Sequence, residues 1–264
     1  MTNKTIALAL SSTGFKFPAH VGAIQAVKQQ GLDVIEISGS SGGALIGGLF
    51  FCGMSVSELK AWAVHTQWFK FFSSGLLSGG LVSLDKFESH LKELTGNKCL
   101  GDVPGLHITA CDINTHSLEI LDHETYPDMT VARAIRASIS IPGVFSPVKH
   151  EGKTLLDGAI MNTLPLNLLK KEADLRVGVR VTYSDRHPVP DTTSIPVIAR
   201  RSLYMIVDRG NAWALPREGC SVVDLDTGFA DGLDVFMSKE KRRLLMHTGN
   251  ADLHTFLENN LRHK

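Results

Sequence analysis

The sequence predicts an α/β protein whose parallel or mixed sheet is covered by helices on both faces. Short apolar runs of strand length alternate with helical patterns along the whole chain. Hydrophobic residues make up 43% of the 264 residues and aromatic residues only 7%, which suits an aliphatic core. No repeat, low-complexity segment or linker interrupts this order, so we expect residues 1–264 to form a single domain.

Two strand–helix pairs open the chain. Residues 5–10 form an apolar run of strand length, and residues 21–30 follow with helical spacing that ends at Gly31. Residues 34–38 predict the next strand and residues 44–50 a packed helix.

Two more helices are expected before the next strands. Residues 55–72 have an amphipathic pattern, and Ser55 with Glu58 has the spacing of a capping box. Residues 83–95 place apolar side chains on one helical face, with Ser83 as the expected N-cap.

The rest of the chain continues the alternation. Residues 107–112 and 117–121 predict a strand pair joined by a polar turn. The further expected elements are a helix at 130–138, strands at 153–156, 175–182 and 221–225, an exposed proline-rich loop at 184–196, a helix at 197–209, and a closing helix at 238–260 with a break at Gly249.

The residues from Gly39 to Gly43 fit the G-x-S-x-G pattern of a nucleophile elbow, with Ser41 at its centre. The predicted strand before it and the helix after it supply the context that this motif needs. Small neighbours such as Gly42 tolerate a strained turn, and the helix N-terminus favours negative charge beside the serine. The motif predicts a nucleophilic Ser41, and the alternative is an ordinary Gly-Ser turn.

Asp157 is the first candidate for the base that a serine nucleophile requires. It stands at the end of an apolar strand and before Gly158, and strand ends of this kind gather in the crevice of open α/β sheets. Burial makes a carboxylate a stronger base by disfavouring its charged form. We predict that Asp157 accepts the Ser41 proton directly, with a turn-forming or helix-capping aspartate as the alternative.

Three later histidines are the other candidates for a base. His187, His247 and His254 follow Asp157, so chain order permits a serine–acid–histidine triad. However, Ser41 comes after only about two strands, too early for the elbow of that fold. The polar surroundings of the three histidines favour solvated or capping side chains.

A loop of small residues, 11–16, lies between the first strand and the first helix. Several of its amides can point to one place, and with Lys16 nearby the loop suits an oxyanion. The phosphate-binding patterns G-x-x-x-x-G-K-[ST] and G-x-G-x-x-G are absent here. A simple strand–helix connection is the alternative.

Taken together, these pieces resemble the patatin-like phospholipase family over most of the chain and in the right order. Residues 8–22 resemble its glycine-rich segment G-G-G-x-R/K-G, and the elbow matches. Residues 137–148 resemble the segment before the family's aspartate, with the run Ser-x-x-x-Pro-x-x-Phe-x-Pro. Asp157-Gly158-Ala159 matches its D-G-G/A motif, and Asn162 and Pro165 fit the residues that follow.

The resemblance implies a three-layer α/β/α fold around a central, mostly parallel mixed sheet. It implies a lipid acyl hydrolase acting on carboxyl esters of phospholipids or lysophospholipids, with Ser41 as nucleophile, Asp157 as general base, no catalytic histidine, and no metal or other cofactor. The oxyanion and substrate would be held by Ser12, Thr13, Gly14, Phe15, Lys16 and Gly42, and the motif glycines would be Gly39, Gly43 and Gly158.

The glycine-rich segment departs from the family pattern. Ser12 and Thr13 stand where glycines are usual, and Phe17 stands where the last glycine is usual. Loss of one oxyanion donor costs about 10²–10³ in kcat. We therefore expect a reshaped oxyanion hole, or one that an activating partner or a membrane reorganises. The alternatives are a serine esterase or lipase acting on neutral or small esters, and a non-enzymatic lipid-binding protein.

Composition restricts the partners and the compartment. The chain has 27 basic and 27 acidic residues, so its charge does not indicate nucleic-acid binding, and any membrane contact must be local and transient. Four scattered cysteines without C-x-x-C spacing favour a reducing, cytoplasmic compartment. No apolar run reaches the roughly 18 residues of a spanning helix, so we expect a cytoplasmic protein that is peripheral at membranes, while export without a cleaved signal stays open.

Aromatic residues gather at one place, before the glycine-rich residues 73–80. They are Trp62, Trp68, Phe69, Phe71 and Phe72. One hypothesis is a mobile flap over the acyl site that touches a bilayer. The alternative is an aromatic cluster packed in the core.

Overall fold

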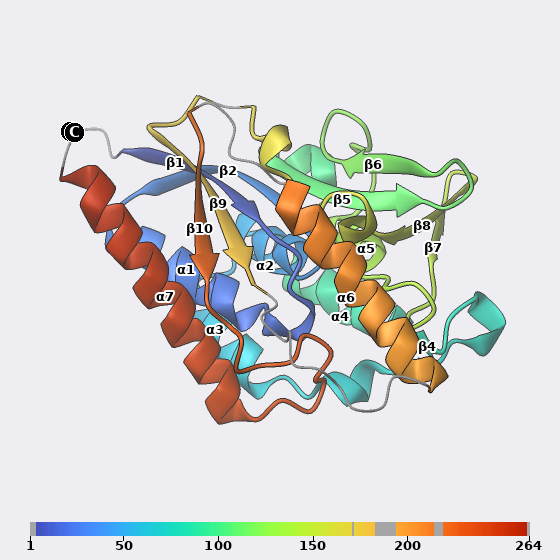
Figure 1. The fold of residues 1–264 in the computed structure, drawn as a ribbon. Coiled ribbons are helices and arrows are strands. Elements are labelled where there is room, and N and C mark those ends of the chain that lie inside the picture. Colours follow the sequence, from blue (N-terminus) through green and yellow to red (C-terminus); the bar gives the residue numbers. More distant parts are fainter. Residues whose placement is uncertain (1–3, 171, 183–193, 214–218, 263–264) are drawn as a thin grey trace.

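The computed structural model describes residues 4–170, 172–182, 194–213 and 219–262 (Figure 1). An eight-stranded sheet lies at its centre, in the order β10-β9-β1-β2-β5-β8-β7, with β6 also pairing with β5. The strands are β1 Thr5–Leu10, β2 Asp33–Ser40, β5 Leu106–Asp112, β6 Ser117–Leu121, β7 Val148–His150, β8 Lys153–Asp157, β9 Leu175–Val181 and β10 Ser221–Leu225. Pairs from β10 to β5 are parallel, whereas β6, β7 and β8 pair antiparallel, so the predicted mixed sheet is confirmed.

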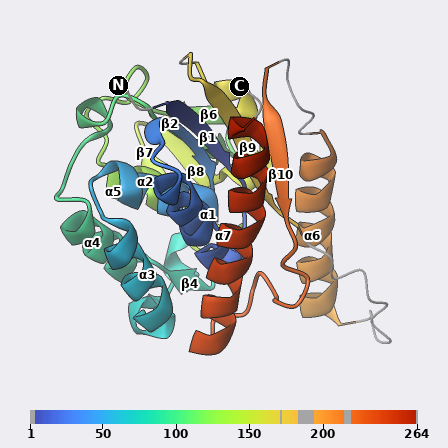
Figure 2. The same cartoon turned by 90° about the vertical axis from the view of Figure 1, so that its left-hand side faces the viewer.

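Helices cover both faces of this sheet (Figures 1 and 2). One face carries α1 Pro18–Gln29, α2 Gly42–Phe51, α5 Val131–Ser138 and α7 Lys239–Leu261, with α3 Val56–His65 and α4 Asp85–Leu94 packed outside them. The other face carries α6 Ile195–Trp213, which stands apart from the other helices in Figure 2. The three layers expected for the fold are therefore present.

The alternation of side chains along β1 explains why both faces are covered. Ile6, Leu8 and Leu10 belong to the large core beneath the helices. Ala7 and Ala9 point the other way, into a smaller core that includes Leu164 and Leu166. Because successive strand residues face opposite sides, a strand that is apolar throughout must be buried on both.

Strands β2 and β8 run toward each other along β5, and their carboxyl ends meet at the site. Ser40 at the end of β2 lies opposite Thr109 of β5, and Asp157 at the end of β8 lies opposite the next residue, Ala110. Since β6 pairs with β5 over 108–112, it occupies the other edge of β5. The carboxyl ends of the parallel β2 and the antiparallel β8 therefore converge on one edge of β5.

The predicted helix at 55–72 is wrong beyond His65. Thr66 has extended backbone angles, and a separate turn of 3₁₀ helix, η2, spans Trp68–Phe71. Side chains bond to two of the last carbonyls of α3: Thr66 Oγ1 donates at 2.6 Å to the Trp62 carbonyl, which also accepts the Thr66 amide, and Arg242 Nη1 donates to the Val64 carbonyl at 3.1 Å. The break turns the side chain of Trp68 into the core.

Ser83 is not the N-cap of the following helix. It belongs to the short strand β4 Val82–Ser83, which pairs with β3 Ser73–Ser74, and Leu84 occupies the N-cap position. Ser83 Oγ still accepts the amide of Asp85 at 3.2 Å. The hairpin pairing therefore takes Ser83 out of the helix while its hydroxyl stays near the helix start.

Gly249 does not break α7. A Cβ built on Gly249 would lie 1.9 Å from the carbonyl oxygen of Ala19, so this glycine permits the close crossing of α1 and α7. Gly22 has the same role on α1, where a Cβ would lie 1.9 Å from the Met246 carbonyl oxygen. The sequence prediction also missed β7, and most of the proline-rich loop predicted at 184–196 lies outside the described residues.

Candidate active site

Ser41 sits on a strained turn between β2 and α2. Its backbone angles are φ 50° and ψ −119°, in a region that residues with a side chain rarely occupy. Glycines make the turn fit, because a Cβ on Gly43 would lie 2.2 Å from the Leu10 carbonyl oxygen, and one on Gly39 would lie 2.6 Å from the Ala44 nitrogen. The local geometry is that of a nucleophile elbow.

Asp157 lies directly beside this serine. Ser41 Oγ donates a hydrogen bond of 2.7 Å to Asp157 Oδ2, and the amide of Ala159 donates to Asp157 Oδ1 at 2.9 Å. Both side chains are buried. Gly158 is required after the aspartate, because a Cβ there would lie 2.4 Å from the carbonyl oxygen of Thr109.

Burial changes the acidity of Asp157. Loss of solvent raises its pKa from 3.8 to about 7, against the opposing effect of the Ala159 amide and the Ser41 hydroxyl. A carboxylate with this pKa is a much stronger base than one in water. It also gains or loses its proton close to neutral pH.

The predicted oxyanion segment lies against the first residue of α2. A Cβ on Gly42 would lie 2.0 Å from Thr13 Oγ1 and 3.0 Å from the Gly14 carbonyl oxygen, so the three residues meet at one place. Gly14 has φ +55°, and a Cβ there would lie 2.1 Å from the Gly232 carbonyl oxygen. The segment therefore keeps the one glycine that its backbone requires.

Several amides of this segment are already bonded. Ser12 donates to the Thr163 carbonyl at 2.8 Å, Phe15 to the Gly232 carbonyl at 2.8 Å, and Lys16 to the Thr13 carbonyl at 3.1 Å. Within the part of the chain that the structure describes, no acceptor is recorded for the amides of Thr13, Gly14 and Gly42.

The side chain of Lys16 connects separate segments of the protein. It is buried, and its Nζ donates to the Thr182 carbonyl at 2.9 Å and to Thr227 Oγ1 at 3.2 Å. The ammonium group thereby joins the end of β9 to the segment after β10.

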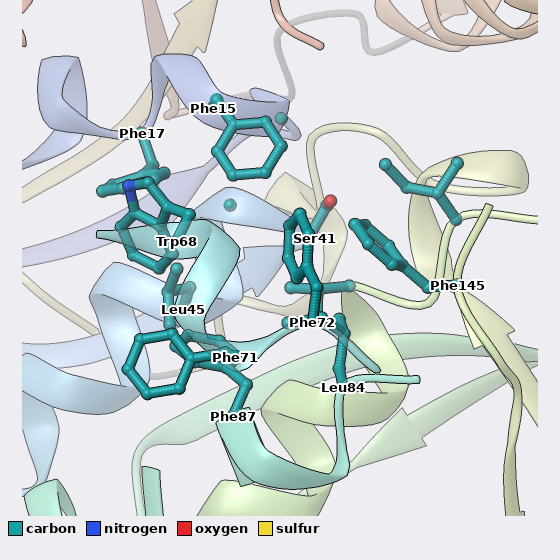
Figure 3. A pocket seen from close by; sticks show the side chains of 14 residues that line it. Phe15, Phe17, Ser41, Leu45, Trp68, Phe71, Phe72, Leu84, Phe87 and Phe145 are labelled. Atoms are coloured by element: carbon teal, nitrogen blue, oxygen red, sulfur yellow. The ribbon is translucent and has the colours of Figure 1, made fainter. Parts of the chain in front are cut away.

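An apolar pocket opens beside Ser41, and Figure 3 shows its aromatic rings gathered around that residue. Its walls come from the predicted oxyanion segment, α2, η2, α4 and the segment after α5. The lining residues are Gly14, Phe15, Phe17, Ser41, Gly42, Leu45, Trp68, Phe71, Phe72, Leu84, Phe87, Ile139, Ile141 and Phe145. Apart from the Ser41 hydroxyl and the backbone, the lining side chains are hydrocarbon or aromatic, so the pocket suits an apolar ligand.

Three of the aromatic residues predicted as a flap, Trp68, Phe71 and Phe72, line this pocket. Trp68 is only 5% exposed, and its ring packs edge-on against Trp62 and Phe17, each with centroids 5.1 Å apart. Phe69 is the exception, since its side chain is 51% exposed. The core alternative therefore describes Trp68, and the flap hypothesis is wrong for that residue.

A second pocket also reaches the Ser41–Asp157 pair. Ser41 and Asp157 line it together with Ser12, Pro142, Tyr204 and Leu233, among others. Ser41 therefore lines both pockets, whereas Asp157 lines the second.

None of the histidines considered as a base reaches Ser41 among the described residues. His247 lies on α7 in a surface hollow shared with α1 and α3, and His254 is hydrogen-bonded to Gln30 at 3.0 Å. His187 lies outside the described residues. Within the described parts of the chain, no three His, Cys, Asp or Glu side chains gather as a metal site.

Six residues of the pocket wall were not predicted as site residues: Leu45, Leu84, Phe87, Ile139, Ile141 and Phe145. Ser138, whose hydroxyl accepts the amide of Ser41 at 2.9 Å, was not predicted as one either. Leu84 and Phe87 lie on the apolar face of a predicted helix. That periodicity does not distinguish a pocket residue from a core residue. Ser138 lay in the segment that resembled the patatin family, and that resemblance was the one available signal.

The fold and the elbow define an α/β protein with a buried serine on a strand-to-helix turn. The chain belongs to the patatin-like phospholipase family, whose model matches residues 8–170. An uncharacterized NTE family protein of Mycobacterium tuberculosis is 30% identical over 190 residues, which are 70% of this chain and 51% of that protein. The chain thus spans about half the length of the curated relatives it matches first.

Solved structures share the fold. VipD from Legionella pneumophila has a TM-score of 0.56 at 13% identity, covering 97% of this chain and 67% of VipD. ExoU of Pseudomonas aeruginosa, in its complex with SpcU, has a TM-score of 0.58 at 14% identity, covering 97% of this chain and 52% of the other. Separately, none of the described helices combines the length and the apolar character needed to cross a bilayer.

Proposed function

We propose that the protein is a lipid acyl hydrolase that cleaves carboxyl esters of phospholipids or lysophospholipids. The observation that carries this proposal is the 2.7 Å hydrogen bond from Ser41 Oγ to a buried Asp157, at the mouth of an apolar pocket. Membership of the patatin-like phospholipase family supports it.

The reaction proceeds in two halves. Ser41 Oγ attacks the ester carbonyl carbon and gives its proton to Asp157 Oδ2. The carbon–oxygen bond to the alcohol then breaks, and Asp157 returns the proton to the leaving oxygen. Water attacks the acyl-enzyme, Asp157 takes a proton from it, and the fatty acid leaves as the proton returns to Ser41 Oγ.

The tetrahedral oxyanion needs donors on the side of Ser41 away from Asp157. The amides of Gly42 and Gly14 are our candidates, with Thr13 beside them, because these residues meet at the start of α2. The helix N-terminus adds a favourable dipole. Ser12, Phe15 and Lys16 then shape the hole, since their amides donate to backbone carbonyls.

The exposed hairpin β3–β4 is proposed as the place of membrane contact. The hairpin follows Phe72 and ends before Leu84, and both of these residues line the apolar pocket. The side chains of Leu76, Leu77 and Leu81 on this excursion are exposed to solvent. A lipid surface would cover these leucines next to the pocket that takes the acyl chain.

The test is fatty-acid release from mixed phospholipid vesicles by wild type, Ser41→Ala and Asp157→Asn. We expect no release by Ser41→Ala and a loss on the order of 10³-fold or more for Asp157→Asn. Fluorophosphonate labelling of Ser41, with and without lipid, separates an enzyme from a lipid-binding protein. Retained hydrolysis in Asp157→Asn together with loss in a His187, His247 or His254 variant would move the assignment to a triad.

A substrate panel separates the alternative classes. Phospholipid, triacylglycerol and a short-chain nitrophenyl ester are compared head to head with the same enzyme preparation. Preference for triacylglycerol or the small ester would favour a neutral-lipid or small-ester hydrolase.

A further inference from the structure

The end of α5 contacts both members of the Ser41–Asp157 pair, although it takes no part in the proposed chemistry. Ser138, the last residue of α5, is fully buried, and its Oγ accepts the backbone N–H of Ser41 at 2.9 Å. Two residues later, the backbone carbonyl of Ser140 accepts the amide of Asp157 at 3.0 Å. One short segment thus holds the nucleophile and the base at the same time.

We propose that Ser138 is a positioning residue for the hydrolysis, and that the segment 138–140 keeps Ser41 and Asp157 in register for proton transfer. This inference rests on the proposed function. Neither Ser138 nor Ser140 touches the reacting atoms, so we expect them to fix the geometry of the Ser41–Asp157 pair and to take no part in the chemistry.

Ser41 needs such a hold because its backbone is strained. Its φ of 50° is unfavourable for a residue with a side chain, and such a conformation persists only where the surroundings fix it. The amide of Ser41 precedes α2, so the helix offers it no acceptor. The hydroxyl of Ser138 satisfies this buried N–H, and without it the turn would lose a contact that defines its shape.

Asp157 is held at three points. Its two carboxyl oxygens accept from Ser41 and from the Ala159 amide, and its own amide donates to Ser140. The third contact comes from the same segment that holds Ser41. A shift of this segment would therefore move one member of the pair relative to the other.

Buried side chains fix the segment itself. Arg136 is 1% exposed, and its Nη1 donates to Ser140 Oγ at 2.6 Å. Ser140 Oγ donates in turn to the Arg136 carbonyl at 2.8 Å. The next residue, Ile141, lines both pockets at Ser41, and Pro142 lines the second, so the segment continues directly into the pocket walls.

Steady-state kinetics on a soluble short-chain nitrophenyl ester test the proposal. We expect Ser138→Ala to lower kcat about 10- to 100-fold with little change in KM, because small displacements of reacting groups cost rates of this size. Fluorophosphonate labelling of Ser41 should slow by a similar factor. Ser38→Ala is the matched control: Ser38 is equally buried, and its Oγ donates to the Pro165 carbonyl at 2.8 Å and not to Ser41 or Asp157.

Hydrogen–deuterium exchange gives a readout that does not depend on activity. Peptides covering residues 39–45 should exchange faster in Ser138→Ala than in wild type or Ser38→Ala, while β10 stays unchanged. If exchange at the elbow is unchanged, or if kcat stays within about twofold of wild type in a folded Ser138→Ala, the proposal is wrong. Equal activity of wild type and Ser41→Ala would instead overturn the proposed function, and the exchange result would still decide whether Ser138 holds the elbow.

Discussion

At the scale of single residues, Asp157 carries the most specific prediction. Its carboxyl group is buried, and burial raises its pKa from 3.8 to about 7. The proposed mechanism needs the ionised form, which becomes more populated as the pH rises. The environment of Asp157 therefore predicts how activity depends on pH.

We predict that kcat/KM on a soluble ester rises with pH through a midpoint near 7, because only the ionised Asp157 accepts the Ser41 proton. Below that midpoint, activity should fall about tenfold per pH unit. The measurement is a pH series at constant ionic strength, with Asp157→Asn as the control that lacks the rising limb. A midpoint near 4 would contradict a buried base.

At the scale of elements, two features lead to testable predictions: the hairpin β3–β4 and the crossing of α1 with α7. The hairpin carries leucines into solvent, where apolar side chains are normally scattered singly. The crossing depends on Gly22 and Gly249, which lie against backbone carbonyls of the opposite helix. The first feature concerns lipid contact and the second concerns stability.

The hairpin prediction concerns vesicle binding by the Ser41→Ala protein, which should not consume the lipid. Replacing Leu76 and Leu77 by serine should weaken binding to phospholipid vesicles about tenfold or more, because each buried leucine contributes about 1.5–3 kcal/mol. Vesicle sedimentation measures this. Ile113→Ser, at an exposed isoleucine of the β5–β6 turn, is the control, and an equal loss in that variant would argue against a role for the hairpin.

For the helix crossing, we predict that Gly249→Ala destabilises the protein by about 1–3 kcal/mol, because the new methyl group would lie 1.9 Å from the Ala19 carbonyl oxygen. Helix propensity alone would give a gain of about 1 kcal/mol, so the sign of the effect separates the two causes. Urea denaturation measures it. Thr255→Ala, at an exposed position of the same helix, should be neutral or stabilising.

At the scale of the whole molecule, the sheet joins the site to a second buried cluster. His107 of β5 lies between two carboxylates, with Nδ1 at 2.9 Å from Asp122 Oδ2 and Nε2 at 3.1 Å from Glu36 Oε1. Burial by itself lowers the pKa of His107, but the two carboxylates outweigh it and raise the pKa above 6.5. The cluster ties β2 to β5 and to the segment after β6.

We predict that His107→Gln lowers the free energy of unfolding by about 3 kcal/mol, because two buried carboxylates lose their cation. The effect should be largest below about pH 6.5, and it should shrink as the pH rises through the raised pKa of His107, where the imidazole of the folded wild type becomes neutral. Urea denaturation at two pH values measures it. His65→Gln, at an exposed histidine, is the control, and a loss that grows with pH would contradict the prediction.

Local signals predicted much of the candidate site. Gly39, Gly42 and Gly43 around Ser41 indicated the elbow, because only small residues fit that turn, and Gly158 marked the turn after Asp157. The expectation that Asp157 meets Ser41 rested on the carboxyl ends of strands gathering in the crevice of an open α/β sheet. In the structure β8 is antiparallel, and the two ends meet because β2 and β8 share one edge of β5. The proximity was predicted, but the topology behind it was not.

The sequence by itself determined the features that depend on neighbours along the chain: most of the order of strands and helices, the elbow, and the family motifs. Only the tertiary structure decided which distant surfaces meet. It placed Trp68 in the pocket wall, Gly249 against α1, and the hydroxyl of Ser138 on the amide of Ser41. The physical reason is that periodicity reports which side of an element is buried, whereas the partner on that side is chosen by packing across the whole molecule.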